Sequence, residues 1–304
     1  MATSFEDLSC AWVEDKKNYV KLSTMCAYQT ILRTHIIPYF KETNSITENE
    51  VQSFVLSKLN AGMSQKSVKD MLVVLKMIGK YAQKKKLMKV ELMDIAFPSN
   101  ETQKKIEVMS RQDEKKLISH LSENFSFENL GMLICLGTGM RIGEICGLRW
   151  EDINLDNAEI EVNRTVERIY LNSPSEKTRL IIEEPKTVNS KRKIPLNNSL
   201  LKIIKPLKKV VNNSFYIITN GETPMEPRIY RKRFEKVLEK LGITKLRFHG
   251  LRHTFATRCI EASNDYKAVS AILGHASITT TFNLYVHPNS EQKKKCIEKM
   301  LKSL

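Results

Sequence analysis

The spacing of apolar residues changes along this sequence, and the change limits the folds that the chain can adopt. Over the first third, apolar residues recur at helical spacing, as Phe5, Leu8 and Trp12 do. From Ile153 the pattern becomes β-rich, and residues 159–162 alternate between charged and apolar side chains. Helical spacing then returns in the last third. The sequence therefore predicts a mainly α fold with a small antiparallel β-sheet, an α+β architecture.

The amino-terminal part of the sequence carries clear helix boundaries. A capping box begins at Thr47, and Ser64 can cap the helix that follows it. Pro38 is expected to close an earlier helix, because proline interrupts the backbone hydrogen bonds of a helix interior. These signals predict a domain of four helices over residues 1–90.

A chain of 304 residues is long enough for a second domain. The polar stretch within residues 91–108 is expected to be the linker, and residues 109–304 the second domain. Asp156 and Asn157 predict a tight turn within the β-rich part. Helices are predicted near residues 110–121, 128–136, 199–208, 228–241, 249–259, 266–273, 278–285 and 291–304.

The charge of the chain favours a polyanionic partner. Lys and Arg number 49 against 34 Asp and Glu, which gives a net charge of +15. Nucleic acid is the obvious partner. A membrane surface fits less well, because the sequence has no long apolar run and no basic amphipathic amino terminus. The first residues do not resemble a signal peptide, so a cytoplasmic protein is expected.

The six cysteines are scattered without a C-x-x-C pair, so they are interpreted as reduced core thiols. His249 and His253 lie one helical turn apart and could share a helix face. The glutamate of a metalloprotease motif does not stand between them. The sequence therefore predicts neither a metal site nor a cofactor.

Five residues of complementary chemistry stand out along the second domain. They are Arg141, Lys186, His249, Arg252 and Tyr285. Two guanidinium groups match the non-bridging oxygens of a phosphodiester in charge and geometry. A tyrosine hydroxyl can form a covalent intermediate, while lysine and histidine can move the protons that the attacking and leaving oxygens exchange. This combination predicts phosphoryl transfer.

The segments around these residues resemble the tyrosine recombinase family, which includes phage-type integrases, integrases of conjugative transposons and Xer-type recombinases. The resemblance covers nearly the whole chain, and the family's sequence boxes occur in the family's order. Residues 138–144 resemble its first arginine box, 185–187 with 192–196 its β-hairpin lysine segment, 249–257 its second arginine box, and 273–277 with Tyr285 its carboxy-terminal box.

The resemblance implies a role for each catalytic residue. Tyr285 would attack the scissile phosphate, which leaves a 3′-phosphotyrosyl bond and a free 5′-hydroxyl. Arg141 and Arg252 would hold the non-bridging oxygens, and Lys186 would protonate the departing 5′-oxygen. Strand exchange would then reverse the step with a new hydroxyl, so the reaction needs no ATP.

Histidines and one glutamate complete the implied site. His249 would handle the tyrosine proton, and His275 would form a hydrogen bond to the phosphate. Glu144 would orient Arg141 or the lysine, although a solvated helix charge is the competing interpretation. His253 is interpreted as a structural core histidine that caps its neighbour rather than as a catalytic residue.

The resemblance also implies an assembly on DNA. The helical domain would bind the core site, and both domains would close around double-stranded DNA. The helix at 291–304 would dock on a neighbouring protomer, or else cover its own core. A homotetramer on two DNA sites, accessory DNA-bending or directionality proteins, and a nucleoid-associated location would follow.

The most direct function is integration and excision of a mobile element. A Xer-type recombinase that resolves dimers is the first alternative. A type IB topoisomerase shares this chemistry, and a catalytically silent DNA-binding protein of the same fold is an alternative of another class.

Overall fold

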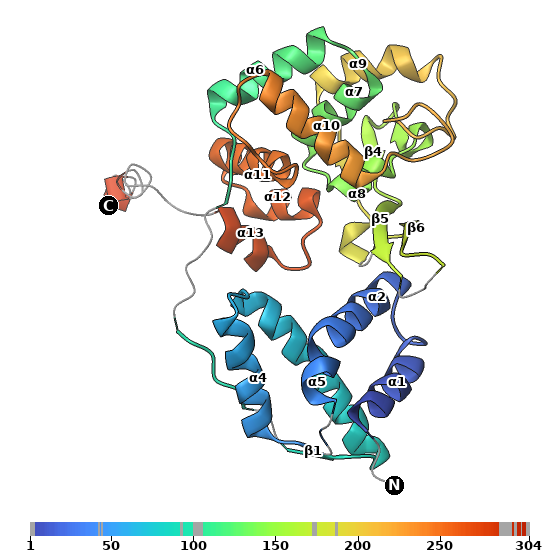
Figure 1. Cartoon of the computed structure of the whole chain (residues 1–304). Helices are drawn as coiled ribbons and strands as arrows, with labels where there is room; N and C mark the ends of the chain where they lie inside the picture. The colour runs from blue at the N-terminus through green and yellow to red at the C-terminus, as the bar shows by residue number, and fades with distance from the viewer. Residues whose placement is uncertain are drawn as a thin grey trace. The chain divides into compact units, whose positions relative to one another are not determined.

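The chain forms two compact units in a computed structural model (Figure 1). The structure describes residues 4–41, 43, 45–91, 94–99, 106–171, 175–185, 188–285, 294, 297–298 and 300–301. One unit comprises Met1–Lys104 with Ile169–Arg179, and the other comprises Lys105–Arg168 with Leu180–Leu304. Within the described ranges, no helix is long and apolar enough to cross a membrane.

The first unit is helical. Its elements are α1 (Phe5–Lys16), α2 (Leu22–Ile31), η1 (Leu32–Ile36), α3 (Ile37–Phe40), α4 (Glu48–Asn60) and α5 (Gln65–Lys85), with a two-residue parallel pairing of β1 (Ser45–Ile46) and β2 (Lys89–Val90). The Thr47 hydroxyl accepts a hydrogen bond from the backbone N–H of Glu50, whose carboxylate accepts one from the N–H of Thr47. The predicted capping box is therefore confirmed, and Ser64 caps α5 as expected.

The prediction that Pro38 ends the second helix is wrong. The helical path continues from α2 through the π-helical turn η1 into α3, and Pro38 lies in the first turn of α3. The wider hydrogen bonding of the π-helical turn shifts the hydrogen-bond register of the helix before the proline. In the first turn of α3, Pro38 does not need the N–H that proline lacks.

Aromatic rings fill the core of the first unit. Phe5, Phe40 and Phe54 are fully buried, and the Phe40 ring centroid lies 5.5 Å from that of Phe5 and 5.4 Å from that of Phe54. The long helix α5 turns Leu75 and Ile78 towards the same core. Burying each such side chain contributes about 1.5–3 kcal/mol, so this unit has a core of its own.

The second unit combines eight described helices with short strands. The helices are α6 (Arg111–Glu123), α7 (Phe127–Thr138), α8 (Ile142–Cys146), α9 (Asn198–Lys208), α10 (Pro227–Lys240), α11 (His249–Ser263), α12 (Tyr266–Leu273) and α13 (Ile278–Tyr285). Seven of them lie where the sequence predicts helices, and α12 and α13 have the predicted bounds, whereas α8 was not predicted. The mainly α fold with small sheets is confirmed.

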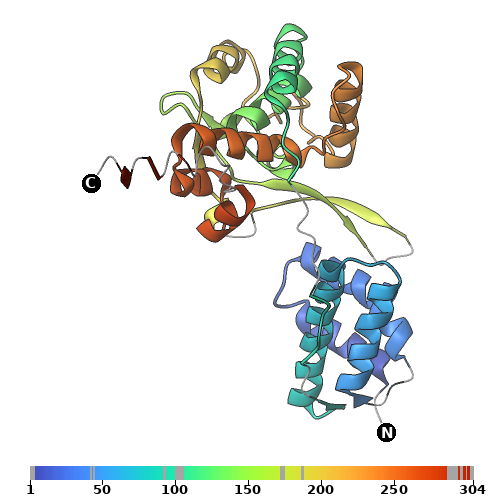
Figure 2. The ribbon, with the colours of Figure 1, turned by 90° about the vertical axis from the view of Figure 1, so that its left-hand side faces the viewer.

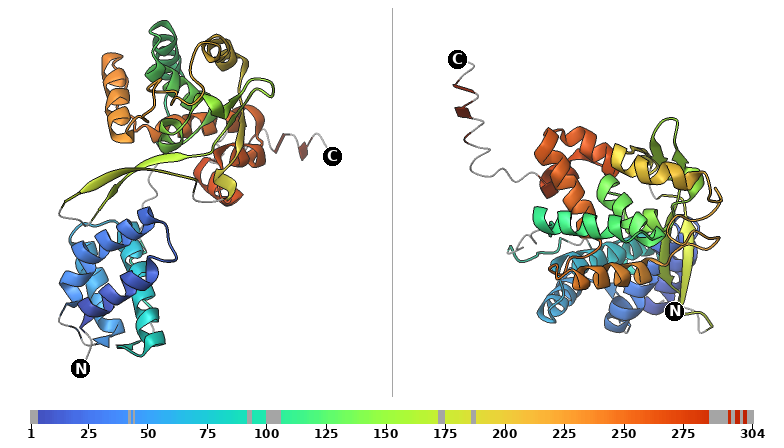
Figure 3. Two further views of the ribbon diagram at one scale, coloured as in Figure 1. Left: turned by 90° about the vertical axis from the view of Figure 1, so that its right-hand side faces the viewer. Right: turned by 90° about the horizontal axis from the view of Figure 1, so that it is seen from above.

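Besides the pairing of β1 with β2, the described strands form two sheets. Strand β4 (Glu159–Glu161) pairs antiparallel with β3 (Ile153–Asn154) on one side and β7 (Lys193–Pro195) on the other. The predicted turn joins β3 to β4, and the Asn154 side chain accepts a hydrogen bond from the Asn157 N–H at 3.0 Å. Strands β5 (Thr165–Tyr170) and β6 (Thr178–Glu183) lie side by side as a long twisted pair (Figures 2 and 3).

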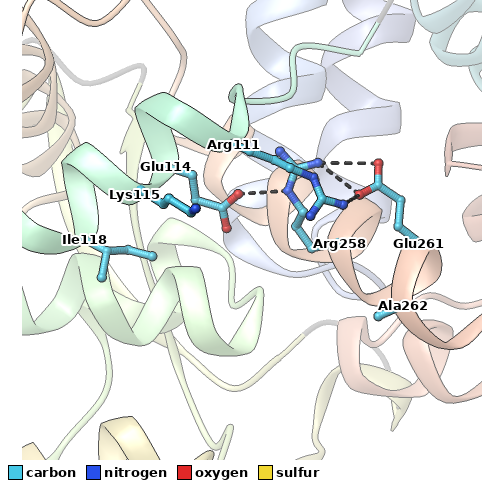
Figure 4. Close-up of a pocket in the computed structure, with 7 residues that line it drawn as sticks. All are labelled: Arg111, Glu114, Lys115, Ile118, Arg258, Glu261 and Ala262. Carbon is cyan, nitrogen blue, oxygen red and sulfur yellow. Dashed lines mark hydrogen bonds and ion pairs between the residues drawn. The ribbon is translucent and has the colours of Figure 1, made fainter.

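Ion pairs join α6 to α11 beside a surface pocket (Figure 4). The Arg258 guanidinium lies 2.8 Å from the Glu114 carboxylate and 3.1 Å from that of Glu261, and it donates to the Met109 carbonyl oxygen. Arg111 reaches Glu261 from α6 at 2.8 Å. These contacts hold the helix that supplies two of the predicted site residues, His249 and Arg252.

Candidate active site

A glycine turn delivers Arg141 to the site. Helix α7 ends at Gly139, which has φ +65°, and a Cβ atom there would lie 2.5 Å from the Phe255 ring. Both the left-handed backbone and the close approach require glycine. Arg141 follows at the start of α8, where its guanidinium contacts the Glu144 carboxylate at 2.7 Å and the Gly274 carbonyl oxygen at 3.2 Å. Its side chain is still 37% exposed, so it can meet a ligand.

Arg252 is buried beneath the site, with 1% of its surface exposed. Its two terminal nitrogens donate to the carbonyl oxygens of Gly139 and Leu273, both at 2.8 Å. These oxygens lie at the carboxyl-terminal ends of α7 and α12, where helix dipoles favour a cation. Burial and the nearby charge of Arg141 lower the pKa of Arg252 to about 10, so it stays charged at neutral pH.

Glu144 joins Arg141 to a third arginine. The Arg192 terminal nitrogens each lie 3.0 Å from a different Glu144 oxygen, and the Arg192 Nε donates to the Ile272 carbonyl oxygen at 2.5 Å. Burial alone would raise the pKa of Glu144, but the hydrogen bond from Arg192 and the charges of both arginines hold it below its ordinary value. Glu144 is 3% exposed, so the solvated-charge interpretation is wrong.

Arg192 is the residue that sequence reasoning missed. Arg192 lies within the segment that resembles the lysine hairpin, but no local sequence pattern indicates that its partner is Glu144, 48 residues away.

Tyr285 ends α13 with only 8% of its surface exposed. Its hydroxyl lies 2.7 Å from Nδ1 of His253. His253 is half-buried on α11, and its interpretation as a structural rather than a catalytic residue stays a prediction. The rings of His249 and His253 meet edge to face, with centroids 4.6 Å apart. The hydrogen bond that the structure describes for the Tyr285 hydroxyl is therefore with His253, one helical turn beyond the predicted His249.

His275 also lies near the tyrosine ring. Its ring is parallel to that of Tyr285, with centroids 6.5 Å apart. Its Nδ1 lies 2.7 Å from the hydroxyl of Thr281, which is fully buried. The Thr281 contact fixes the ring, and Nε2 remains for a further partner.

Burial and the positive charges around the site lower the pKa values of His249 and His275. Burial, together with the charges of Arg252, Arg141 and Arg192, lowers the pKa of His275 to about 4. His249 is exposed, but the protein packed around its ring and the charges of His253, Arg252 and Arg141 bring its pKa to about 4 as well. Such a positive environment suits an anion, because a bound phosphate would offset this repulsion.

Burial raises the pKa of Tyr285, although Arg252 and Arg141 oppose the change. The tyrosine is therefore a neutral phenol at neutral pH, and it has to lose its proton before or during any attack.

The structure brings five of the six predicted site residues to one place: Arg141, His249, Arg252, His275 and Tyr285. Lys186 lies outside the described residues, as does most of the predicted helix at 291–304. Among the described residues, no three His, Cys, Asp or Glu side chains are grouped to hold a metal. The described cysteines are free, and burial raises the pKa of Cys135 to about 12.

Comparison with known proteins identifies the class to which this fold and site belong. Residues 107–292 match the phage integrase family, and residues 4–59 match the SAM-like N-terminal domain of phage integrases. The chain therefore belongs to the phage integrase family. As a tyrosine-type recombinase of this family, it is an enzyme that cleaves and rejoins DNA.

Individual relatives agree with this assignment. The chain is 26% identical to the ICEBs1 integrase of Bacillus subtilis (strain 168), over 96% of this chain and 80% of that protein. It is 27% identical to a XerC-like tyrosine recombinase of Caldanaerobacter subterraneus subsp. tengcongensis, over 96% and 81%. Its fold resembles the Tn1549 transposon integrase in complex with transposon right end DNA, with a TM-score of 0.78, 22% identity, and coverage of 98% and 99%.

Proposed function

We propose that this chain integrates and excises a mobile element by site-specific recombination, through a covalent bond between Tyr285 and a 3′-phosphate of DNA. The observation that carries the proposal is the position of the Tyr285 hydroxyl in a site built around two arginines. The family to which the chain belongs and its resemblance to a conjugative element's integrase support the same reaction.

Arg141 and Arg252 bind the non-bridging oxygens of the scissile phosphate. A guanidinium carries five N–H donors, and Arg252 uses only two nitrogens on backbone carbonyls. Arg141 is the more exposed of the two, and it can turn its free donors towards the phosphate. Because the arginines supply fixed positive charge where the transition state gains negative charge, the proposed mechanism needs no metal.

The remaining roles concern protons. His275 donates to a phosphate oxygen from Nε2, while Thr281 holds its other nitrogen. Lys186 protonates the departing 5′-oxygen, as the family's lysine does. Glu144 and Arg192 keep the Arg141 side chain in place.

The proposed partner is double-stranded DNA. Residues 1–90 bind the core site, 91–108 connect the domains, and 109–304 perform the chemistry, with the terminal helix docking on a neighbouring protomer. The net charge of +15 supports DNA binding. A homotetramer on two DNA sites is proposed, since one solved relative is described as a lambda integrase tetramer bound to a Holliday junction. Accessory DNA-bending or directionality proteins and a cytoplasmic, nucleoid-associated location complete the proposal.

Covalent trapping tests this function. Nicked suicide duplexes with sequence from both ends of the element around this gene would be incubated with wild type and Tyr285→Phe, without metal. A protein–DNA adduct on a denaturing gel with wild type alone is the expected result. An adduct with Tyr285→Phe would remove Tyr285 from its role, and DNA binding without any adduct would support a catalytically silent protein.

Resolution of dimers is the second candidate, and the XerC-like relative favours it. The choice of substrate separates the two functions. Preferred cleavage of the element's ends supports integration and excision, whereas preferred cleavage of chromosomal or plasmid dimer-resolution sites supports the alternative.

A further inference from the structure

His275 can donate a hydrogen bond to a phosphate only from a ring nitrogen that carries a hydrogen. A neutral imidazole has one such hydrogen, on Nδ1 or on Nε2, and its other nitrogen is an acceptor. The hydrogen bond at one nitrogen therefore decides whether the other nitrogen donates or accepts.

The group at Nδ1 of His275 is the hydroxyl of Thr281, at 2.7 Å. Thr281 is fully buried, and among the described residues its hydroxyl has one hydrogen-bond partner, the His275 ring. If Nδ1 carried the ring hydrogen, the hydroxyl would accept it, and the hydroxyl's own buried hydrogen would be left without an acceptor. If the hydroxyl donates to Nδ1, both groups are satisfied. The geometry therefore favours a ring hydrogen on Nε2.

We propose that Thr281 is a positioning residue of this enzyme, whose hydroxyl donates to Nδ1 of His275 and keeps the ring hydrogen on Nε2, where a non-bridging phosphate oxygen accepts it. The inference rests on the function proposed above and deepens it by naming the residue that keeps His275 a donor. Thr281 acts on the phosphate only through His275.

Thr281 lies on the helix that carries the nucleophile. Thr281 and Tyr285 are four residues apart on α13 and both are buried, so they lie on one face of this helix. The imidazole of His275 lies near both of them, since its ring is parallel to that of Tyr285 with centroids 6.5 Å apart. The backbone N–H of His275 donates to the Ser270 carbonyl oxygen of α12 at 3.2 Å. The backbone of His275 is therefore fixed by α12, and its ring by α13.

The position of the single ring hydrogen matters because the imidazole is neutral. Burial and the charges of Arg252, Arg141 and Arg192 bring the pKa of His275 to about 4, well below neutral pH. An imidazolium would donate from both nitrogens, whatever their partners. A neutral ring with its hydrogen on Nδ1 would instead turn a lone pair towards the phosphate, so that two acceptors would face each other.

Thr281→Val is the informative variant, because it removes the hydroxyl and keeps the branched shape. Thr281→Ser retains the hydroxyl, and Thr280→Val makes the same change at the exposed neighbouring position of α13. The measurement is the single-turnover rate of adduct formation on nicked duplexes at saturating DNA. We expect Thr281→Val to react about 10- to 100-fold more slowly, the loss that removal of such a partner causes at histidines bound to metals.

The two comparison variants should react at rates close to that of wild type. A Thr281→Val rate equal to that of wild type would overturn the proposal. A Thr281→Ser rate as low as that of Thr281→Val would also overturn it, because the methyl group rather than the hydroxyl would then be responsible.

A double variant distinguishes positioning from packing. In a His275→Ala background, Thr281→Val should cause no further loss of rate, because the group through which Thr281 acts is already absent. A further loss as large as that of the single Thr281→Val variant would show that the threonine supports α13 itself, and it would refute the positioning role.

The ring hydrogen can also be located without DNA. In wild type at pH 7, the ¹⁵N NMR signals of His275 should show a protonated Nε2 and an unprotonated Nδ1, and Thr281→Val should give a mixture of both forms. A protonated Nδ1 in wild type would refute the proposal, even if a substituted variant folds poorly. Failure of the proposed function is a different result, because wild type would then form no adduct while the NMR signals would still support or refute the assigned hydrogen.

Discussion

Removing Arg192 should destabilise the catalytic unit strongly, although the residue was assigned no chemical step. In Arg192→Met, the buried Glu144 carboxylate loses two hydrogen bonds of 3.0 Å and keeps Arg141 as its charged partner. Breaking a buried ion pair from one side costs about 3–5 kcal/mol. Since Arg141 still neutralises one oxygen, we expect the lower end, about 3 kcal/mol, or about 6–12 °C in Tm for a unit of this size.

The second half of the experiment is the double variant. Glu144→Gln alone leaves the Arg192 guanidinium, 7% exposed, without its counter-charge. In Glu144→Gln with Arg192→Met both charges are gone, so the loss should be smaller than the sum of the single losses by about 1–3 kcal/mol. Urea denaturation at pH 7.5 measures all three. A loss below about 1 kcal/mol for Arg192→Met, or simple additivity, would refute the reasoning.

Three further predictions concern Arg252, Gly139 and stability at low pH. Arg252→Lys should keep DNA binding but lower the single-turnover cleavage rate at least about 100-fold, because an ammonium cannot make the bidentate contact with a phosphate. A rate near that of wild type would show that Arg252 does not bind the non-bridging oxygens. Gly139→Ala should lower the Tm, since Cβ would strain the left-handed backbone and press on Phe255, and an unchanged melting curve would contradict this. His249 and His275 have pKa values of about 4 in the fold against an ordinary 6.5, so the unfolded chain takes up their protons first and stability should fall as pH drops from 6.5 to 4. Equal urea midpoints at pH 6.5 and pH 4 would contradict the predicted loss of stability.

Local patterns predicted most of the fold. Helices α12 and α13 and the capping box at Thr47 follow from apolar spacing and side-chain chemistry within a few residues. The π-helical turn before Pro38 could not be predicted, because it depends on how neighbouring helices pack rather than on a local signal.

The candidate site was predictable in its residue types but not in its contacts. The boxes located Arg141 and Tyr285, yet the partners of the tyrosine depend on how α13 packs on α11. His253 lies 32 residues from Tyr285 along the chain, and His249 offered the same side chain one turn earlier. Sequence spacing places both imidazoles on one face, but only the packed structure distinguishes which of them reaches the hydroxyl.

Through its two carbonyl contacts, the Arg252 side chain links the carboxyl-terminal ends of α7 and α12. Gly139 precedes Arg141, and Leu273 precedes the turn that leads to His275, so the guanidinium connects the segments that carry these two residues. A phosphate that pulled this guanidinium towards itself would also weaken its hydrogen bond to the Leu273 carbonyl oxygen at the end of α12. Binding of the proposed phosphate and anchoring of the segment that leads to Tyr285 would thus depend on the same guanidinium. If α12 and α13 were exchanged for those of a relative, the new segment would therefore have to place a backbone carbonyl oxygen where that of Leu273 lies.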